Sequence, residues 1–135
     1  MRYNSLEGWG LTTDNTNLIM SDGTNTLTYL NPDNFKLVKT LTVTENEMPV
    51  NNLNELEYIN GFIYADIWQT NFIVRIDTST GKVVGKLDMS SLALEANNRN
   101  PGADALNGIA YDSSTNKIYV TGKLWTNIYQ INFPH

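Results

Sequence analysis

Amides, carboxylates and a tryptophan occur close together in the middle of the chain. Asn54 and Glu55 stand near the start of one predicted strand, and Trp68 followed by Gln69 ends the next. Carboxamides donate and accept hydrogen bonds, carboxylates move protons, and an aromatic plate encloses the apolar parts of a ligand. This combination predicts a site for a small polar substrate.

Short apolar segments surround this site and repeat along the chain in the same order. Their strands carry β-branched and aromatic residues, and Asn-Pro-Asp, Ser-Asp-Gly and Asn-Gly turns separate them, as antiparallel meanders require. When the repeats are aligned, Leu30, Ile76 and Ile131 are equivalent, which gives periods of 46 and 55 residues. Four short strands at such a period are typical of a β-propeller blade.

The sequence therefore predicts an all-β chain built from propeller blades, each a four-stranded antiparallel meander. Residues 1–135 form one partial β-propeller domain, with blades at 8–45, 53–89 and 104–134. The third blade lacks a fourth strand, and a polar insertion around 94–102 lengthens the second period. A plain β-sandwich is the alternative, although a sandwich gives no reason for turn chemistry that repeats in register.

Length, composition and charge narrow the function classes. A chain of 135 residues that is 41% hydrophobic suffices for one domain with a core. It has no apolar run near the ~18 residues that span a bilayer, and it contains no cysteine for disulfides, thiolate metal sites or nucleophiles. The net charge of −5 comes without the basic stripe that neutralises phosphates. We expect neither a membrane span nor a nucleic-acid partner.

No metal or cofactor is predicted either. His, Asp and Glu residues show no ligand spacing, and Asp22-Gly23 and Asp77-Thr78-Ser79 are better explained as turns. Phosphate-loop, dinucleotide and Ser-His-Asp patterns are absent. A calcium ion bound only by backbone carbonyls would leave no trace in the sequence, so that alternative stays open.

Six motifs resemble, in their order along the chain, the glutaminyl cyclase family of plants and bacteria, also called glutamine cyclotransferases. They are Glu7-Gly8-Trp9-Gly10-Leu11-Thr12, Met20-Ser21-Asp22-Gly23, Pro49 to Glu57, Ile67-Trp68-Gln69-Thr70, Leu106-Asn107-Gly108-Ile109-Ala110 and Thr121-Gly122-Lys123-Leu124-Trp125. The resemblance implies a five-bladed β-propeller and an enzyme that converts an N-terminal glutamine into pyroglutamate with release of ammonia. It covers about three of the five blades, the C-terminal portion.

The resemblance also implies site residues. Trp9 and Trp68 match the family's pocket tryptophans, Asn54 an asparagine of a family motif, and Lys123 a pocket lysine. Because the attacking amine and the carboxamide belong to one molecule, the site must only fold the substrate, stabilise an oxyanion and move a proton. We expect the tryptophans to enclose the substrate while Asn54 and Lys123 donate hydrogen bonds to the oxyanion.

The motifs matched by this chain do not include the proton-transfer group of the family. The glutamate assigned to this step in the family lies upstream of the position of Trp9, in the part that this chain does not match, which leaves Glu55 as the local candidate. Gln69 and Asn107 are further substrate-binding candidates, with backbone hydrogen bonds at the blade ends as their alternative.

The main candidates also have purely structural alternatives. The two tryptophans would pack between blades, Lys123 would be a solvated lysine, and Asn54 would cap a turn. Glu55 and Glu57 would be solvated edge charges or would pair with Arg75 or a lysine. The sole histidine, at position 135, is expected to be a disordered terminus or a cloning remnant.

The predicted function is that of a glutaminyl-peptide cyclotransferase acting on the N-terminal glutamine of peptides or proteins. A non-catalytic propeller fragment and a peptide-binding module that lacks the catalytic acid are the alternatives. Open blade faces predict a homo-oligomer that closes the propeller, with Arg2 to Leu6 supplying a strand to a neighbouring copy. The family suggests a secreted or periplasmic bacterial protein, although the chain carries no signal peptide.

Overall fold

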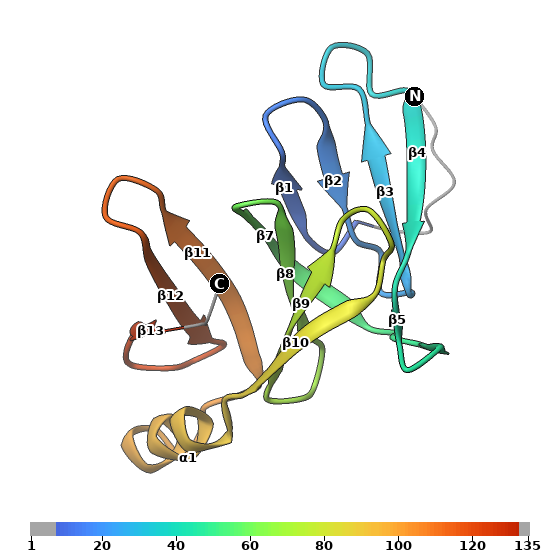
Figure 1. Cartoon of the computed structure of the whole chain (residues 1–135). Helices are drawn as coiled ribbons and strands as arrows, with labels where there is room; N and C mark the ends of the chain where they lie inside the picture. Colours follow the sequence, from blue (N-terminus) through green and yellow to red (C-terminus); the bar gives the residue numbers. More distant parts are fainter. Residues whose placement is uncertain (1–7, 133–135) are drawn as a thin grey trace.

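Three antiparallel β-sheets follow one another along the chain in the computed structural model, which describes residues 8–132 (Figure 1). We call these sheets blades 1, 2 and 3. Blade 1 contains β1 (Leu11–Thr13), β2 (Leu18–Met20), β3 (Thr26–Leu30) and β4 (Leu37–Thr42). Blade 2 contains β7 (Leu53–Ile59), β8 (Phe62–Ile67), β9 (Phe72–Asp77) and β10 (Val83–Asp88). Blade 3 contains β11 (Leu106–Asp112), β12 (Lys117–Gly122) and β13 (Tyr129–Ile131).

Each blade is a meander, because the order of strands in the sheet follows their order in the chain. The β7–β8 turn shows the local cause: Asn60 and Gly61 have φ angles of 51° and 90°, and Ile59 pairs with Phe62 across them. Positive φ at both central residues gives the two-residue hairpin whose twist matches that of the flanking strands. The predicted fold class of antiparallel propeller blades is confirmed.

Two hydrophobic cores lie between the blades. The core between blades 1 and 2 includes Ile19, Leu27, Leu56, Ile63 and Val74. The core between blades 2 and 3 includes Tyr64, Ile73, Leu106, Ile118 and Val120. Since successive side chains of a strand point to opposite faces, the central blade contributes to both cores, which explains the near-continuous apolar runs of β8 and β9.

Between the blades, the chain forms a small hairpin and a helix. The hairpin, β5 (Thr44–Glu45) with β6 (Met48–Pro49), joins blades 1 and 2. The helix, α1 (Ser90–Arg99), joins blades 2 and 3 and occupies the lower end of the molecule in Figure 1. It is the one departure from the all-β prediction among residues 8–132, and it covers most of the segment predicted as a polar insertion.

The sequence of α1 accounts for its limits. The Asp88 carboxylate accepts a hydrogen bond from the Ser90 N–H at 2.8 Å, and Ala96 is the residue that the helix buries. The helix ends before Asn100-Pro101, because a residue that precedes proline avoids helical geometry. No helix in the described part of the chain is long and apolar enough to cross a membrane.

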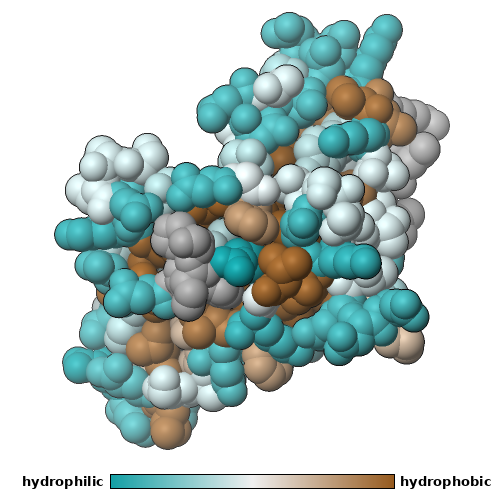
Figure 2. Space-filling model, viewed as in Figure 1, coloured by the Kyte–Doolittle hydropathy of each residue, from teal (hydrophilic) through white to brown (hydrophobic). Residues whose placement is uncertain are grey.

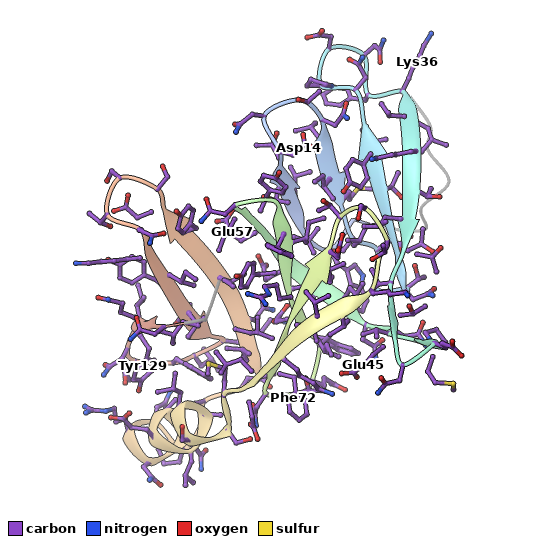
Figure 3. The ribbon with its side chains drawn as sticks, in the orientation of Figure 1. Asp14, Lys36, Glu45, Glu57, Phe72 and Tyr129 are labelled. Carbon is purple, nitrogen blue, oxygen red and sulfur yellow. The ribbon has the colours of Figure 1, made fainter. Side chains whose placement is uncertain are left out.

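Glu57 of β7 connects all three blades. Its carboxylate accepts hydrogen bonds from the Thr12 hydroxyl of blade 1 at 3.2 Å and from the Tyr111 N–H of blade 3 at 3.1 Å. Figure 3 shows Glu57 between β7 and β11. Glu57 is therefore hydrogen-bonded between blades and not merely a solvated edge charge, and the Arg75 guanidinium lies over the Phe62 ring, 4.9 Å from its centroid.

Two expectations concern residues outside the described range. The strand exchange predicted for Arg2 to Leu6 and the terminal position of His135 both fall there.

Candidate functional site

In blade 2, a β-bulge stands at the start of the inner strand. Leu53 pairs with Ile67 and Leu56 with Ala65, so Asn54-Glu55 together face the single residue Asp66. A bulge of this kind leaves one residue unpaired and re-aims a side chain. Asn54 is thus a strand residue at a bulge, and the expectation that it caps a turn was wrong.

The other two blades repeat this arrangement. In blade 1, Trp9-Gly10 face Ser21, since the Trp9 N–H donates to the Ser21 carbonyl and the Ser21 N–H to the Gly10 carbonyl, both at 2.9 Å. In blade 3, the pairing shift places Asn107-Gly108 opposite Thr121. The first of the two bulge residues is Trp9 in blade 1, Asn54 in blade 2 and Asn107 in blade 3. Two positions after the residue that faces each bulge, the chain has Gly23 in blade 1, Trp68 in blade 2 and Lys123 in blade 3. Five predicted site residues therefore lie at one end of the inner strands.

Trp9 and Trp68 form an aromatic corner. Their ring centroids are 5.4 Å apart and their planes make an angle of 70°. Gly23 makes room for the Trp9 ring, because a Cβ atom there would come within 2.5 Å of it. The Trp68 N–H donates to the Asn52 carbonyl at 2.8 Å, and the Asn52 N–H donates to the Gly23 carbonyl at 2.9 Å, so the loops of blades 1 and 2 hold both rings in place.

A chain of hydrogen bonds fixes Asn54 against blade 1. The Gly10 N–H donates to the Ser21 hydroxyl oxygen at 2.8 Å, and this hydroxyl donates to the Asn54 carbonyl at 2.6 Å. Ser21 is fully buried and Asn54 is 7% exposed. Gly10 permits this approach, since a Cβ atom at that position would lie 2.0 Å from the Asn54 carbonyl oxygen.

Asp66 lies beneath the bulge and is 1% exposed. Its Oδ1 accepts a hydrogen bond from the Glu55 N–H at 2.7 Å, whereas its buried Oδ2 has no hydrogen-bond partner among the described residues. The pKa of Asp66 is raised from 3.8 to about 7. Burial is the main cause and the negative charge of Glu55 adds to it, while the Glu55 N–H and the positive charge of Lys123 act in the opposite direction. Burial also raises the pKa of Glu55.

Lys123 follows β12 and is exposed. Its N–H donates to the Ala105 carbonyl at 3.1 Å, and its carbonyl accepts from the Asp104 N–H at 2.8 Å, so its backbone is anchored to the start of blade 3. Gln69 is also exposed, with a φ of 62° in the tight turn after β8. The structure thus places Lys123 within electrostatic reach of Asp66, and Gln69 on the rim next to Trp68.

The chain matches the family model of glutamine cyclotransferases over residues 1–133. It belongs to the glutamine cyclotransferase family. A plant relative, the glutaminyl-peptide cyclotransferase of Arabidopsis thaliana, is 42% identical over 133 residues. The match covers 96% of this chain and 41% of the plant protein, so the chain spans about two fifths of that relative.

A solved structure agrees with this membership, and another shares the fold. The glutaminyl cyclase of Myxococcus xanthus superposes with a TM-score of 0.90 at 43% identity, covering 98% of this chain and 57% of that one. The hydrazine synthase of Kuenenia stuttgartiensis has a TM-score of 0.63 at 13% identity, covering 98% of this chain and 34% of that chain, and therefore shares the fold alone.

Two hollows flank the inner strands of this family member. One of about 270 Å³ lies against Trp9, Leu11 and Met20 on the outer side of blade 1. Another of about 510 Å³ lies at the opposite end of the strands, where Tyr58 and Tyr111 line it, and none of the predicted site residues does. Among residues 8–132 there is no group of three or more His, Asp or Glu side chains that could hold a metal ion.

Asp66 is the site feature that sequence reasoning missed. In the sequence it is only a polar residue near the end of an apolar strand, because its burial depends on how the blades pack together. A signal was nevertheless present: in the aligned repeats, Ser21 and Thr121 stand where Asp66 does. A buried ionisable residue at a position where the other blades carry a neutral hydroxyl marks a candidate functional group.

Proposed function

We propose that this chain carries a large part of the pocket of a glutaminyl-peptide cyclotransferase, which converts an N-terminal glutamine into pyroglutamate with release of ammonia. The observation that supports this most is the repeated bulge, which brings Trp9, Asn54, Trp68 and Lys123 to one end of the inner strands in a member of this family. These residues come from all three blades, so the pocket depends on the whole described chain.

The aromatic corner suits the first requirement of the reaction. A glutamine side chain must fold back until its carboxamide carbon meets its own α-amine. Trp9 and Trp68, 5.4 Å apart at 70°, offer two walls against which the methylene groups pack in this compact conformation. When the pyroglutamate ring forms between these two walls, water is also excluded from the reacting atoms.

The polar residues meet the second requirement. When the amine nitrogen bonds to the carboxamide carbon, the carbonyl oxygen becomes an oxyanion, and the Asn54 carboxamide and Lys123 ammonium are the donors for it. A proton then passes from the attacking nitrogen to the departing one, the original C–N bond breaks and ammonia leaves. Glu55, whose pKa burial raises toward the working range of an acid–base group, is the local candidate for this transfer.

A binding module without turnover is the second candidate function. It is favoured by the extent of the match, since the chain spans 41% of the plant relative and 57% of the bacterial structure. A group supplied by the remaining part of those proteins would then complete the catalytic set.

Measurement of ammonia released from glutaminyl-alanine tests the proposal. Lys123→Ala and Trp68→Ala should each lower the rate about 100-fold, the usual cost of one oxyanion donor or pocket wall. Lys117→Ala removes an exposed lysine of β12 and serves as the matched control, which should keep the full rate. Release no faster than without protein, together with retained peptide binding, would favour the binding module.

The outer faces of blades 1 and 3 suggest an assembly. Leu11 is 61% exposed, although the equivalent Leu56 of the central blade is 3% exposed, and Ile128 on blade 3 is 72% exposed. Brown patches also interrupt the mostly hydrophilic face drawn in Figure 2. A second copy of the chain, joined face to face, would cover these residues. Light scattering should find a dimer or larger ring, and a monomer would contradict this part of the proposal.

A further inference from the structure

The three blades provide an internal comparison for Asp66. Position 66 of blade 2 corresponds to Ser21 in blade 1 and to Thr121 in blade 3, each facing a bulge. The Ser21 hydroxyl accepts the bulge N–H of Gly10 at 2.8 Å, just as Asp66 Oδ1 accepts that of Glu55 at 2.7 Å. A neutral hydroxyl therefore suffices for the structural purpose of this position.

The burial of the Asp66 carboxyl group is energetically unfavourable. It is 1% exposed, its Oδ2 is buried, and no described residue donates a hydrogen bond to that oxygen. Transfer of a carboxylate from water to such a place costs free energy unless a positive charge compensates. The hydrogen bond from Glu55 does not explain why the residue is acidic, because serine would accept it too.

The surroundings of Asp66 contain one compensating charge. Glu55 from β7 carries a negative charge, β9 places the apolar Ile73 opposite, and Lys123 after β12 carries the positive charge that acts on Asp66. Lys123 is exposed, so its long side chain can adopt many conformations. A fixed negative charge below the site would favour the conformations in which the ammonium group turns inward.

We propose that Asp66 is a positioning residue, whose buried negative charge draws the Lys123 ammonium over the candidate site. This rests on the proposed function in so far as Lys123 is taken as an oxyanion donor. The Glu55 N–H holds the carboxyl group in place, and blade 3 supplies the lysine that the charge orients. Protonation of Asp66 near neutral pH releases Lys123.

Competitive labelling of the lysines tests this without any need for activity. The folded chain is treated briefly with a water-soluble acetylating reagent, and the ratio of Lys123 to Lys117 labelling is measured by mass spectrometry. In the wild type this ratio should fall as the pH rises from 6 to 8, because ionised Asp66 withdraws Lys123 from the reagent. In Asp66→Ser, which copies blade 1, and in Asp66→Asn, the ratio should be independent of pH and about threefold higher at pH 8, a size expected for one partly exposed ion pair.

Asp77→Asn is the matched control, because it removes an exposed carboxylate of the same blade and should leave the ratio unchanged. Circular dichroism establishes that each variant is folded. Equal ratios in the wild type and both Asp66 variants would overturn the inference, even if the chain cyclises glutaminyl-alanine. Altered ratios without cyclisation would support it and count against the proposed activity instead.

Discussion

The two interfaces between the blades differ in polarity. Between blades 1 and 2 the buried polar groups form a neutral chain, in which Gly10, Ser21 and Asn54 satisfy one another. Between blades 2 and 3 lies Asp66, a carboxyl group whose pKa is raised, mainly by burial, to about 7. Tyr29 in the core between blades 1 and 2 has a pKa raised to about 12, so it stays neutral near pH 7. The first interface thus holds the aromatic corner and Asn54 among neutral groups, whereas the second holds a carboxyl group that titrates near neutral pH. The comparison suggests a site with one fixed wall and one wall that responds to pH.

The largest expected effect concerns the interface between blades 2 and 3, and it is seen in the stability of the Asp66→Ser variant. Because the pKa of Asp66 rises from 3.8 in the unfolded chain to about 7 in the folded one, the folded wild type keeps a proton that the unfolded chain releases between these values. Wild-type stability must then fall as pH rises from 4 to 7, by up to about 4 kcal/mol. Urea unfolding should find the variant more stable than the wild type at pH 8 and no more stable at pH 4. If the variant and the wild type differed equally in stability at pH 4 and pH 8, a buried charge at position 66 would be contradicted.

Gly10→Ala should break the neutral interface. The new Cβ would lie 2.0 Å from the Asn54 carbonyl oxygen, which belongs to backbone and cannot turn away. We expect a loss of about 3 kcal/mol in the free energy of unfolding, measured with urea. Gly102→Ala is the control, since the nearest atom to its Cβ is 3.5 Å away, an ordinary contact. If both variants were equally stable, the close approach of blades 1 and 2 would be wrong.

Glu57→Gln sharpens the comparison, because this side chain reaches across both interfaces. The carboxamide keeps one acceptor but loses the charge that strengthens the hydrogen bonds from Thr12 and Tyr111. A loss of about 1 kcal/mol is expected in the same measurement. Glu47→Gln, at an exposed position, should change stability by less than about 0.5 kcal/mol. A loss as small as that of the control would mean that Glu57 does not hold the blades together.

The fold was predictable from the sequence to the extent that its determinants are local. The two-residue turn at Asn60-Gly61 and the apolar strands repeat visibly, so the meanders and blade order follow from short segments. The helix α1 did not follow, because Ala96 is its one buried residue and its apolar stripe is weak.

The site was predictable through motifs but not through geometry. Trp9, Asn54 and Lys123 were identified by resemblance, and the structure adds that Trp9 and Asn54 are equivalent bulge residues of two blades, whereas Lys123 of the third blade is equivalent to Trp68. A bulge is a property of strand pairing, which single-strand patterns do not reveal. The burial of Asp66 likewise depends on how the blades pack together, which the sequence of one strand does not reveal.

The central claim is that the corner formed by Trp9 and Trp68 receives an N-terminal glutamine. The chain has three tryptophans, and the third, Trp125, packs within blade 3, with its Nε1–H donated to the Asp104 carbonyl at 2.8 Å and its ring against Tyr129. Three indole N–H signals in a ¹⁵N-correlated NMR spectrum, assigned with Trp→Phe variants, therefore provide two probes and an internal control. Addition of glutaminyl-alanine should shift the Trp9 and Trp68 signals and leave that of Trp125 in place, while asparaginyl-alanine, one methylene shorter, shifts them less. Unchanged signals for Trp9 and Trp68, or a shift confined to Trp125, would contradict the account.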